Sequence, residues 1–311
     1  MNNRVCDLLG IRYPIIQGAM QWVSDASLVI AASNAGALGV LATAGKDKAY
    51  TLAQIQQIKQ RTQQPFAVNI TILSPTVQEV FEVALAEKVP FVVLTAGNPT
   101  PFVPHLKAAG IPFMGVVATV KQAVKMQSLG AIAVVVEGQE AGGHIGELTT
   151  MTLVPQVASA VDIPVIAAGG IADGRGLAAA MMLGAEAVQM GTAFLAATET
   201  NVHPDFKAAI LQADASQVTV TGRRINHAVR CLDNGLAQAF REMDQRGAEP
   251  EAYEALARGA AYKASQTGDV TMGSVMVGQI VGLVTHEQSV DDIIQGVIQQ
   301  YRELRTSLGV L

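Results

Sequence analysis

His144 follows two glycines at the end of an apolar run, in the segment EGQEAGGHIG. The run over residues 131–136 has the length and the β-branched content of a buried strand. Gly142 and Gly143 remove the side chains that would stop a flat ligand from approaching the backbone. An imidazole can give or take a proton near neutral pH, so His144 is the candidate catalytic residue. The alternative is a loop histidine whose ring is tied to the backbone.

Glycines also close the next two apolar runs, which end in AAGGIADGRG and in QMGT. Gly169, Gly170 and Gly191 offer unobstructed backbone N–H groups, and Thr192 adds a hydroxyl. Together these groups predict a phosphate cradle that contains no lysine. Neither loop is a dinucleotide or Walker fingerprint, and each loop alone is equally typical of a tight turn.

Polar and small residues at other strand ends predict a planar heterocyclic ligand. The first apolar run delivers QGAM over residues 17–20, and its small residues followed by a methionine would let a ring lie on the backbone. Asn69, Glu137 and Gln189 can hydrogen-bond a polar heterocycle, or else cap neighbouring loops. A planar, phosphate-bearing cofactor beside one histidine suggests flavin mononucleotide (FMN).

The elements that must position these residues are short apolar runs alternating with amphipathic stretches. Eight strands are expected, ending near Gln17, Leu41, Ile70, Thr95, Val117, Glu137, Ala167 and Met190. A repeat of roughly 25 residues fits a strand plus a crossover helix, so a TIM (β/α)8 barrel is favoured over an open doubly wound sheet. Ser74 with Pro75 opens a helix to about Lys88, and Thr119 opens one to about Leu129. In such barrels the functional residues lie at the carboxyl ends of the strands, and a phosphate commonly binds after strands seven and eight.

The pattern changes after the eighth strand, which divides the chain into three parts. Residues 1–200 are expected to form the barrel, and the more highly charged residues 201–273 a smaller inserted helical subdomain. Residues 274–311 are expected to supply C-terminal helices that pack back on the barrel. The first of these helices lies in the segment GSVMVGQIVGLV, and a closing amphipathic helix runs from Ser289 to Leu308.

Composition limits the class of protein. With 311 residues, 50% hydrophobic and 15% charged, and a net charge of -5, the chain is typical of a soluble globular protein and not of a nucleic-acid binder. Cys6 and Cys231 fit neither a disulfide framework nor a metal site, and no metal-binding residues are predicted. Residues 28–45 carry no charged side chain but are interrupted by polar residues and glycines, so a buried helix and a strand are expected instead of a membrane span. The N-terminus lacks a secretory signal, and a cytoplasmic protein is expected.

Several motifs together are similar to a known family. PIIQGAM, PFAVNI, EGQEAGGHIG, PVIAAGGIADGRG, GAEAVQMGT and GSVMVGQIVGLV resemble the nitronate monooxygenase and 2-nitropropane dioxygenase superfamily over nearly the whole chain. Within it, QGAM, LTTMTLV, INHAVR and GSVMVGQIVGLV are similar to the FabK-type enoyl-acyl-carrier-protein reductases II. Departures are small: Ala19 stands where related sequences often have glycine, and Thr271 and Met272 replace a more glycine-rich turn.

The resemblance implies an FMN-containing barrel of bacterial fatty-acid elongation. NADH or NADPH would reduce the flavin, and the reduced flavin would pass hydride to the β-carbon of a trans-2-enoyl thioester on an acidic acyl carrier protein. His144 would lie at the substrate face and protonate the α-carbon or polarise the thioester carbonyl. The resemblance also implies a homodimer and, in some members, activation by a monovalent cation, for which no ligands can be read from the sequence.

The candidate cofactor-binding residues lie at expected strand ends, in the histidine loop or in the C-terminal apolar segment. They are Gly18, Ala19, Met20, Asn69, Glu137, Gly142, Gly143, Ala168, Gly169, Gly170, Gln189, Met190, Gly191, Thr192, Met276 and Gln279.

Two other functions fit the same residues. A nitronate monooxygenase would use the same flavin with oxygen as the oxidant and His144 as a base or anion-orienting group. A non-catalytic flavin-binding or phosphate-binding barrel is the third hypothesis, and the intact histidine loop argues against it. For the acidic carrier protein, Arg223, Arg224, His227 and Arg230 form a candidate basic patch; the alternative is an internally paired helix face.

Overall fold

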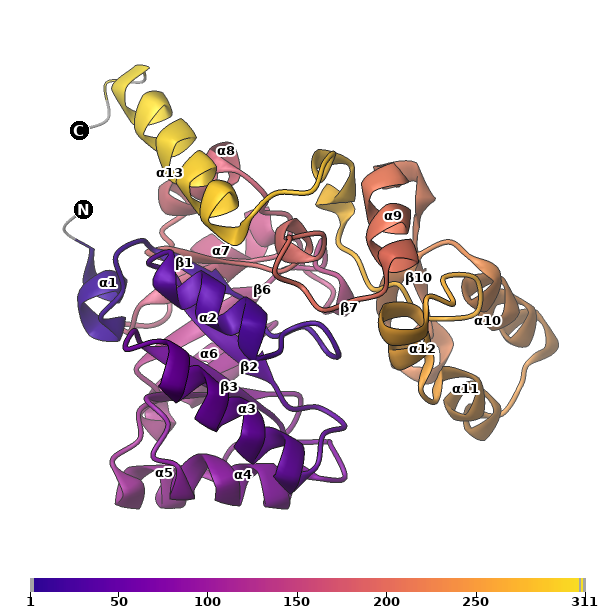
Figure 1. Ribbon diagram of the computed structural model, residues 1–311, viewed down its shortest axis with the longest axis horizontal. Helices are drawn as coiled ribbons and strands as arrows, with labels where there is room; N and C mark the ends of the chain where they lie inside the picture. Colours follow the sequence, from indigo (N-terminus) through magenta and orange to yellow (C-terminus); the bar gives the residue numbers. More distant parts are fainter. Residues whose placement is uncertain (1–2, 308, 310–311) are drawn as a thin grey trace.

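Eight parallel strands close into a barrel in the computed structural model, which describes residues 3–307 and 309 (Figure 1). The strands follow one another around the barrel in the order β1 (Ile15–Gln17), β2 (Leu38–Ala42), β3 (Phe66–Thr71), β4 (Phe91–Thr95), β5 (Phe113–Val117), β6 (Ala133–Glu137), β8 (Val165–Ala168) and β9 (Ala187–Met190). Pairing of Ile15 with Val188 joins the first strand to the last. Every expected strand is present and ends at the predicted residue or one residue later, which confirms the TIM barrel.

The barrel helices lie outside the strands. They are α1 (Arg4–Leu9), α2 (Ala26–Asn34), α3 (Lys48–Arg61), α4 (Val77–Ala86), α5 (Val103–Ala109), α6 (Val120–Leu129), α7 (Thr150–Ala158) and α8 (Gly174–Met182). The Thr119 hydroxyl caps α6 by accepting a hydrogen bond from the Gln122 amide, at the residue where a helix start is predicted. The segment over residues 28–45 is mostly α2 and β2, as expected, and no helix of the described chain is long and apolar enough to cross a bilayer.

Alternating side chains of the strands fill two layers of core. On β4, Val93 points into a cluster inside the barrel, whereas Val92 and Leu94 belong to the larger cluster that also contains the helices. The strands are therefore buried on both faces, which leaves their carboxyl ends and the loops after them as the place for a site.

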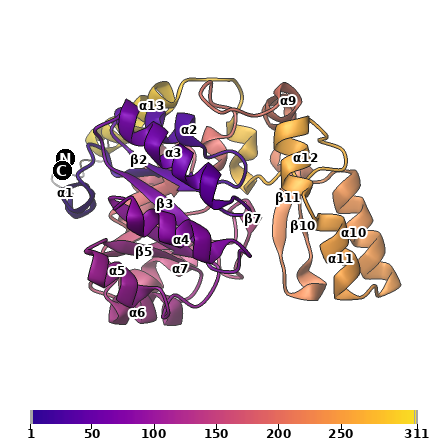
Figure 2. The ribbon, with the colours of Figure 1, turned by 60° about the horizontal axis from the view of Figure 1, so that its bottom comes forward.

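The chain after the barrel forms a lobe that contains strands as well as helices. Its helices are α9 (Pro204–Gln212), α10 (Gly235–Arg246), α11 (Pro250–Ala257) and α12 (Ala260–Thr267), and its hairpin strands are β10 (Val218–Thr221) and β11 (Val229–Leu232). Sequence patterns predict only helices here, because four-residue strands are too short for a clear alternation. The hairpin continues into a third, antiparallel strand from the barrel side, β7 (Gly143–His144) (Figure 2).

The segment expected to be the first C-terminal helix is not an α-helix. Gly273 is a bend, residues 274–278 have no regular secondary structure, and a 3-10 turn, Gln279–Leu283, follows. Its backbone bonds to other parts of the chain: the Gly278 amide donates to Thr192 Oγ1 at 2.8 Å and the Gln279 amide to the Glu140 carbonyl at 3.0 Å. Partners in neighbouring loops thus replace intrahelical hydrogen bonds.

The closing helix is present as α13 (Val290–Ser307), and the predicted end at Leu308 lies outside the described residues. It packs on α8, where the Gln300 carboxamide accepts a hydrogen bond from the Gly174 amide at 2.7 Å. Figure 2 shows both termini at the end of the barrel away from the lobe.

Candidate functional site

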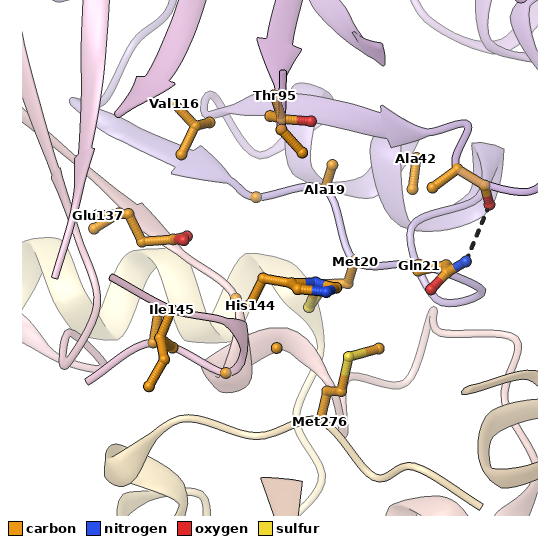
Figure 3. A pocket seen from close by; sticks show the side chains of 18 of the residues that line it. Ala19, Met20, Gln21, Ala42, Thr95, Val116, Glu137, His144, Ile145 and Met276 are labelled. Atoms are coloured by element: carbon orange, nitrogen blue, oxygen red, sulfur yellow. Dashed lines mark hydrogen bonds between the residues drawn. The ribbon is translucent and has the colours of Figure 1, made fainter. Parts of the chain in front are cut away.

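A cavity of about 890 Å³ lies at the carboxyl ends of the barrel strands and extends to the lobe. Fifteen of the predicted residues line it: Gly18, Ala19, Met20, Asn69, Glu137, Gly142, Gly143, His144, Ala168, Gly169, Gly170, Gln189, Gly191, Thr192 and Met276. Figure 3 shows several of their side chains directed into one space. Residues from the ends of most barrel strands therefore meet around a single volume, which is within the usual size range for ligand pockets.

Two predicted residues, Met190 and Gln279, do not line the cavity. Met190 is a buried strand residue whose carbonyl accepts a hydrogen bond from the Gly18 amide at 2.9 Å. Gln279 has an exposed side chain, and only its backbone contributes, through the bond to Glu140. Both residues support neighbours that line the cavity.

His144 combines a fixed backbone with an unbonded ring. Its strand β7 pairs with β11, with Val229 opposite His144, and the Ile145 amide donates to the Ala228 carbonyl at 3.1 Å. The ring lies in the cavity (Figure 3) and forms no hydrogen bond with any described residue. Burial, and secondarily the charge of His227, lowers the pKa of His144. The imidazole is consequently uncharged at neutral pH and available to a ligand.

The two glycines before His144 are required by the packing. Gly143 has a φ of 77°, in the left-handed region that favours glycine. A Cβ on Gly142 would lie 2.6 Å from the Val277 carbonyl carbon, so the 273–278 segment crosses directly over this loop. The loop is therefore held between that segment and β11.

Glu137 faces the same cavity from the end of β6, and its carboxyl group forms no hydrogen bond with any described residue (Figure 3). Burial raises its pKa to about 7. Asn69 is instead part of a network, since its amide donates to Thr95 Oγ1 at 3.2 Å and its oxygen accepts from Thr71 Oγ1 at 3.1 Å. The site thus offers one free carboxyl group and a fixed row of polar atoms to a ligand.

The two glycine loops leave a set of amide groups without partners. The backbone N–H groups of Gly170, Ile171, Gly191 and Thr192 donate to no acceptor among the described residues. Gly170 has a φ of 73°, and a Cβ there would lie 3.3 Å from the Glu140 Cβ. Converging unpaired amides bind anionic oxygens, so this donor set fits a phosphate. With Met20 and Met276 on the cavity wall, the residues also fit a flat ring, and hence an FMN molecule.

The candidate basic patch contains one buried arginine, Arg230, and three exposed residues. Arg223 pairs with Glu147 at 3.3 Å, and Arg224 donates to the Asp244 carbonyl at 3.1 Å. Arg230 is 6% exposed and donates twice to the Gln139 carbonyl, at 2.9 and 3.1 Å. Arg230 thus holds β11 to the histidine loop and is internally paired, whereas Arg223, Arg224 and His227 lie at the surface, so a basic docking patch stays a prediction for those three.

Sequence reasoning missed the cavity wall that the lobe supplies. Asn226, His227 and Ala228 line the cavity from the β10–β11 turn, and Phe206, Ala261 and Ser265 line it from α9 and α12. The motif INHAVR carries the signal, since an asparagine before a histidine fits the left-handed turn found at Asn226, with φ of 56°. Across the described ranges, no three His, Cys, Asp or Glu side chains gather as metal ligands would.

Fold and site together fit an α/β-barrel enzyme with a cavity suited to a phosphate-bearing planar ligand. The family model described as nitronate monooxygenase matches residues 2–86 and 76–300. The chain therefore belongs to the nitronate monooxygenase family of oxidoreductases, as the motifs predict.

Individual relatives carry different names. FabK from Thermotoga maritima shares 42% identity over 99% of each chain, with a TM-score of 0.96. The (3aS,4S,5R,7aS)-5-hydroxy-7a-methyl-1-oxo-octahydro-1H-indene-4-carboxyl-CoA dehydrogenase of Rhodococcus jostii is 31% identical over 100% of this chain and 99% of its own. A probable nitronate monooxygenase of Staphylococcus saprophyticus is also 31% identical, over 98% of this chain and 99% of its own.

Proposed function

We propose that this protein is an FMN-dependent trans-2-enoyl-acyl-carrier-protein reductase that uses NADH or NADPH. The observation that carries the proposal is the uncharged, unbonded ring of His144 in a cavity that also holds unpaired amide groups, within a chain 42% identical to FabK over almost its full length. The relative named for a carboxyl-CoA compound adds support for a thioester substrate.

Each part of the cavity has a role in this reaction. FMN, when bound and reduced by the nicotinamide, supplies a hydride to the β-carbon of the enoyl thioester. The amides of Gly170, Ile171, Gly191 and Thr192 would hold the cofactor phosphate, and Met20 and Met276 would line the space for its ring. The ring N–H of His144 hydrogen-bonds the thioester carbonyl oxygen and stabilises the negative charge that develops there. The α-carbon takes up a proton from water, so that NAD(P)H and one proton together saturate the double bond.

The second candidate is a nitronate monooxygenase, which the family description and the staphylococcal relative favour. A nitronate is an anion, and an uncharged His144 offers it a hydrogen bond but no opposite charge. The same ring suits a neutral thioester carbonyl better. Reductase is therefore the preferred function.

Anaerobic stopped-flow absorbance of the flavin separates the two. NADH or NADPH should bleach the flavin, and crotonyl-CoA should then restore its absorbance. If the nicotinamides reduce the flavin poorly and a nitronate alone bleaches it, the protein is a monooxygenase. A flavin that neither nicotinamide nor nitronate reduces would indicate a non-catalytic flavin-binding protein.

The partners follow from the same proposal. An enoyl reductase of fatty-acid elongation takes its substrate on an acidic acyl carrier protein in the cytoplasm, and we propose a homodimer. Sedimentation equilibrium should give twice the chain mass of 32.5 kDa. A mass of one chain at micromolar concentration would contradict the dimer.

A further inference from the structure

A second imidazole from the lobe meets the ring of His144. The rings of His144 and His227 lie edge to face, with centroids 5.6 Å apart and an interplanar angle of 78°. Both residues line the cavity. No described residue forms a hydrogen bond with either ring. Each imidazole therefore has the other imidazole as its ring neighbour.

The backbone fixes His227 in this position. Its amide donates to the Gly222 carbonyl at 3.0 Å, within a turn that has left-handed residues at both Gly222 and Asn226. Two residues further on, Val229 pairs with His144 across the β7–β11 ladder. His227 therefore lies in the turn just before the strand that pairs with His144, which brings the two rings together.

The other charged groups around the pair are already engaged or lie elsewhere in the cavity. Arg223 and Glu147 pair with each other at 3.3 Å, and Arg230 donates to the Gln139 carbonyl. The Glu140 carboxylate accepts from the Thr150 amide at 2.9 Å and caps α7. Glu137 faces the cavity from β6. Apart from burial, the charge that acts on His144 is that of His227.

We propose that His227 is a positioning residue that fixes the ring orientation of His144 through their edge-to-face contact. This inference rests on the proposed function, in which a neutral His144 N–H binds the thioester carbonyl. Edge-to-face contact restricts rotation of the His144 ring. Two positive imidazoliums this close would repel each other, so His227 adds to the effect of burial in disfavouring the charged form of His144. His144 is thereby favoured as an uncharged hydrogen-bond donor.

Two variants separate orientation from charge. His227→Phe keeps an aromatic ring of similar size and removes the charge, whereas His227→Gln removes the ring. His286→Gln, in an exposed loop far along the chain, is the control. Circular dichroism and flavin absorbance first establish that each protein is folded and loaded.

NMR titration of the ring signals of His144 is the first readout, and it does not depend on activity. Removing His227 should raise the pKa of His144 in both variants and leave it unchanged in the control. The second readout is the pH profile of flavin reoxidation by crotonyl-CoA. Because protonated His144 is inactive, a raised pKa moves the loss of rate at acid pH to higher pH in His227→Phe. In His227→Gln the rate should also fall about tenfold at high pH through loss of ring orientation, while flavin reduction by the nicotinamide stays as in the wild type.

Unchanged titration of His144 in both variants, with reoxidation rates like those of the wild type, would overturn the role of His227. Failure of the proposed function looks different: wild-type flavin would then not be reoxidised by crotonyl-CoA, while the NMR titration would still report whether His227 acts on His144.

Discussion

Glu137 and His144 face the same cavity, and burial moves the pKa of each toward its uncharged form. The pKa of Glu137 is raised to about 7 and that of His144 is lowered. Both shifts favour the neutral side chains, in a site where the unpaired backbone amides are the strongest attraction for an anion. A ligand in this cavity would therefore be held mainly by hydrogen bonds from uncharged donors, namely the His144 ring and the backbone amides.

The raised pKa of Glu137 makes the stability of the flavin-free protein depend on pH. The folded protein binds this proton more tightly than the unfolded chain, whose value is 4.5, so stability is lost as pH rises from 4.5 through about 7. Glu137→Gln has no proton to lose and should gain stability relative to wild type over this window, by up to about 3 kcal/mol. Urea unfolding at pH 5 and pH 8 measures the difference. Glu147→Gln, whose side chain is exposed, should show no such trend, and a pH-independent gain for Glu137→Gln would contradict the assignment.

His144→Ala tests the candidate catalytic ring. The ring contributes no hydrogen bond to the fold, so the variant should keep its yellow FMN. Reoxidation of the reduced flavin by crotonyl-CoA should slow by about 10²- to 10⁴-fold. Stopped-flow absorbance at saturating substrate measures this rate. Enoyl reduction at the wild-type rate would remove His144 from the mechanism.

Among the elements, the barrel strands could be predicted and the small strands of the site could not. Runs such as residues 133–137 are apolar on both faces and return at a regular interval, which is typical of a buried parallel sheet. The two residues of β7 carry no such pattern, and their partner β11 lies much later in the chain. His227 was missed as a cavity residue for the same reason, because its position depends on that pairing.

In the 273–284 segment, by contrast, the sequence predicts an α-helix that the structure does not contain. Its apolar and small residues fit a helix pattern, but glycines at 142 and 278 allow two backbone segments to cross closely, and hydrogen bonds between those segments replace the helix. Local sequence cannot reveal this, since the competing partners are in loops distant in sequence.

The loop between β8 and α8 carries the predicted phosphate contact, and Gly170→Leu tests it. Leucine is strained at a φ of 73°, and its Cβ would press on Glu140. The loop should shift and its amides should no longer converge, so the purified variant should be largely free of flavin. Gly296→Leu is the control, because Gly296 lies in α13 with open space around it. Absorbance gives the flavin content, and full loading of Gly170→Leu would contradict the phosphate site.

At the scale of the whole molecule, the lobe has a core of its own. Leu236, Phe240, Tyr253 and Ala260 form a separate cluster, whereas Phe206 and Ala264 of the lobe belong to the larger cluster that also contains the barrel helices. The lobe meets the barrel through β7, through the Trp22–Tyr262 ring contact at 4.8 Å and through Gln266, which donates to the Trp22 carbonyl at 2.8 Å. A cluster of four buried side chains is much smaller than the cores of the barrel, so this part of the lobe should open more readily than the closed barrel.

Phe240→Ala should therefore loosen the lobe and leave the barrel intact. The cavity left by a ring that is 7% exposed costs about 3–5 kcal/mol. Hydrogen exchange measured by mass spectrometry should rise across α10–α12, and through β11 in the His144 loop, while β2–β4 stay protected. Phe81→Ala, in the barrel cluster, should give the reverse pattern. Equal rises in both halves would show that the molecule opens as one unit.

The pairing of β7 with β11 also sets the order in which the site can be completed while the chain is being made. A chain emerges from the ribosome with its N-terminus first. All eight barrel strands precede Val229, so the barrel can close while β7 still has no partner. His144 is thus translated well before the hairpin that orients it. The newly made barrel acquires its reactive histidine loop in final form only when the lobe has followed.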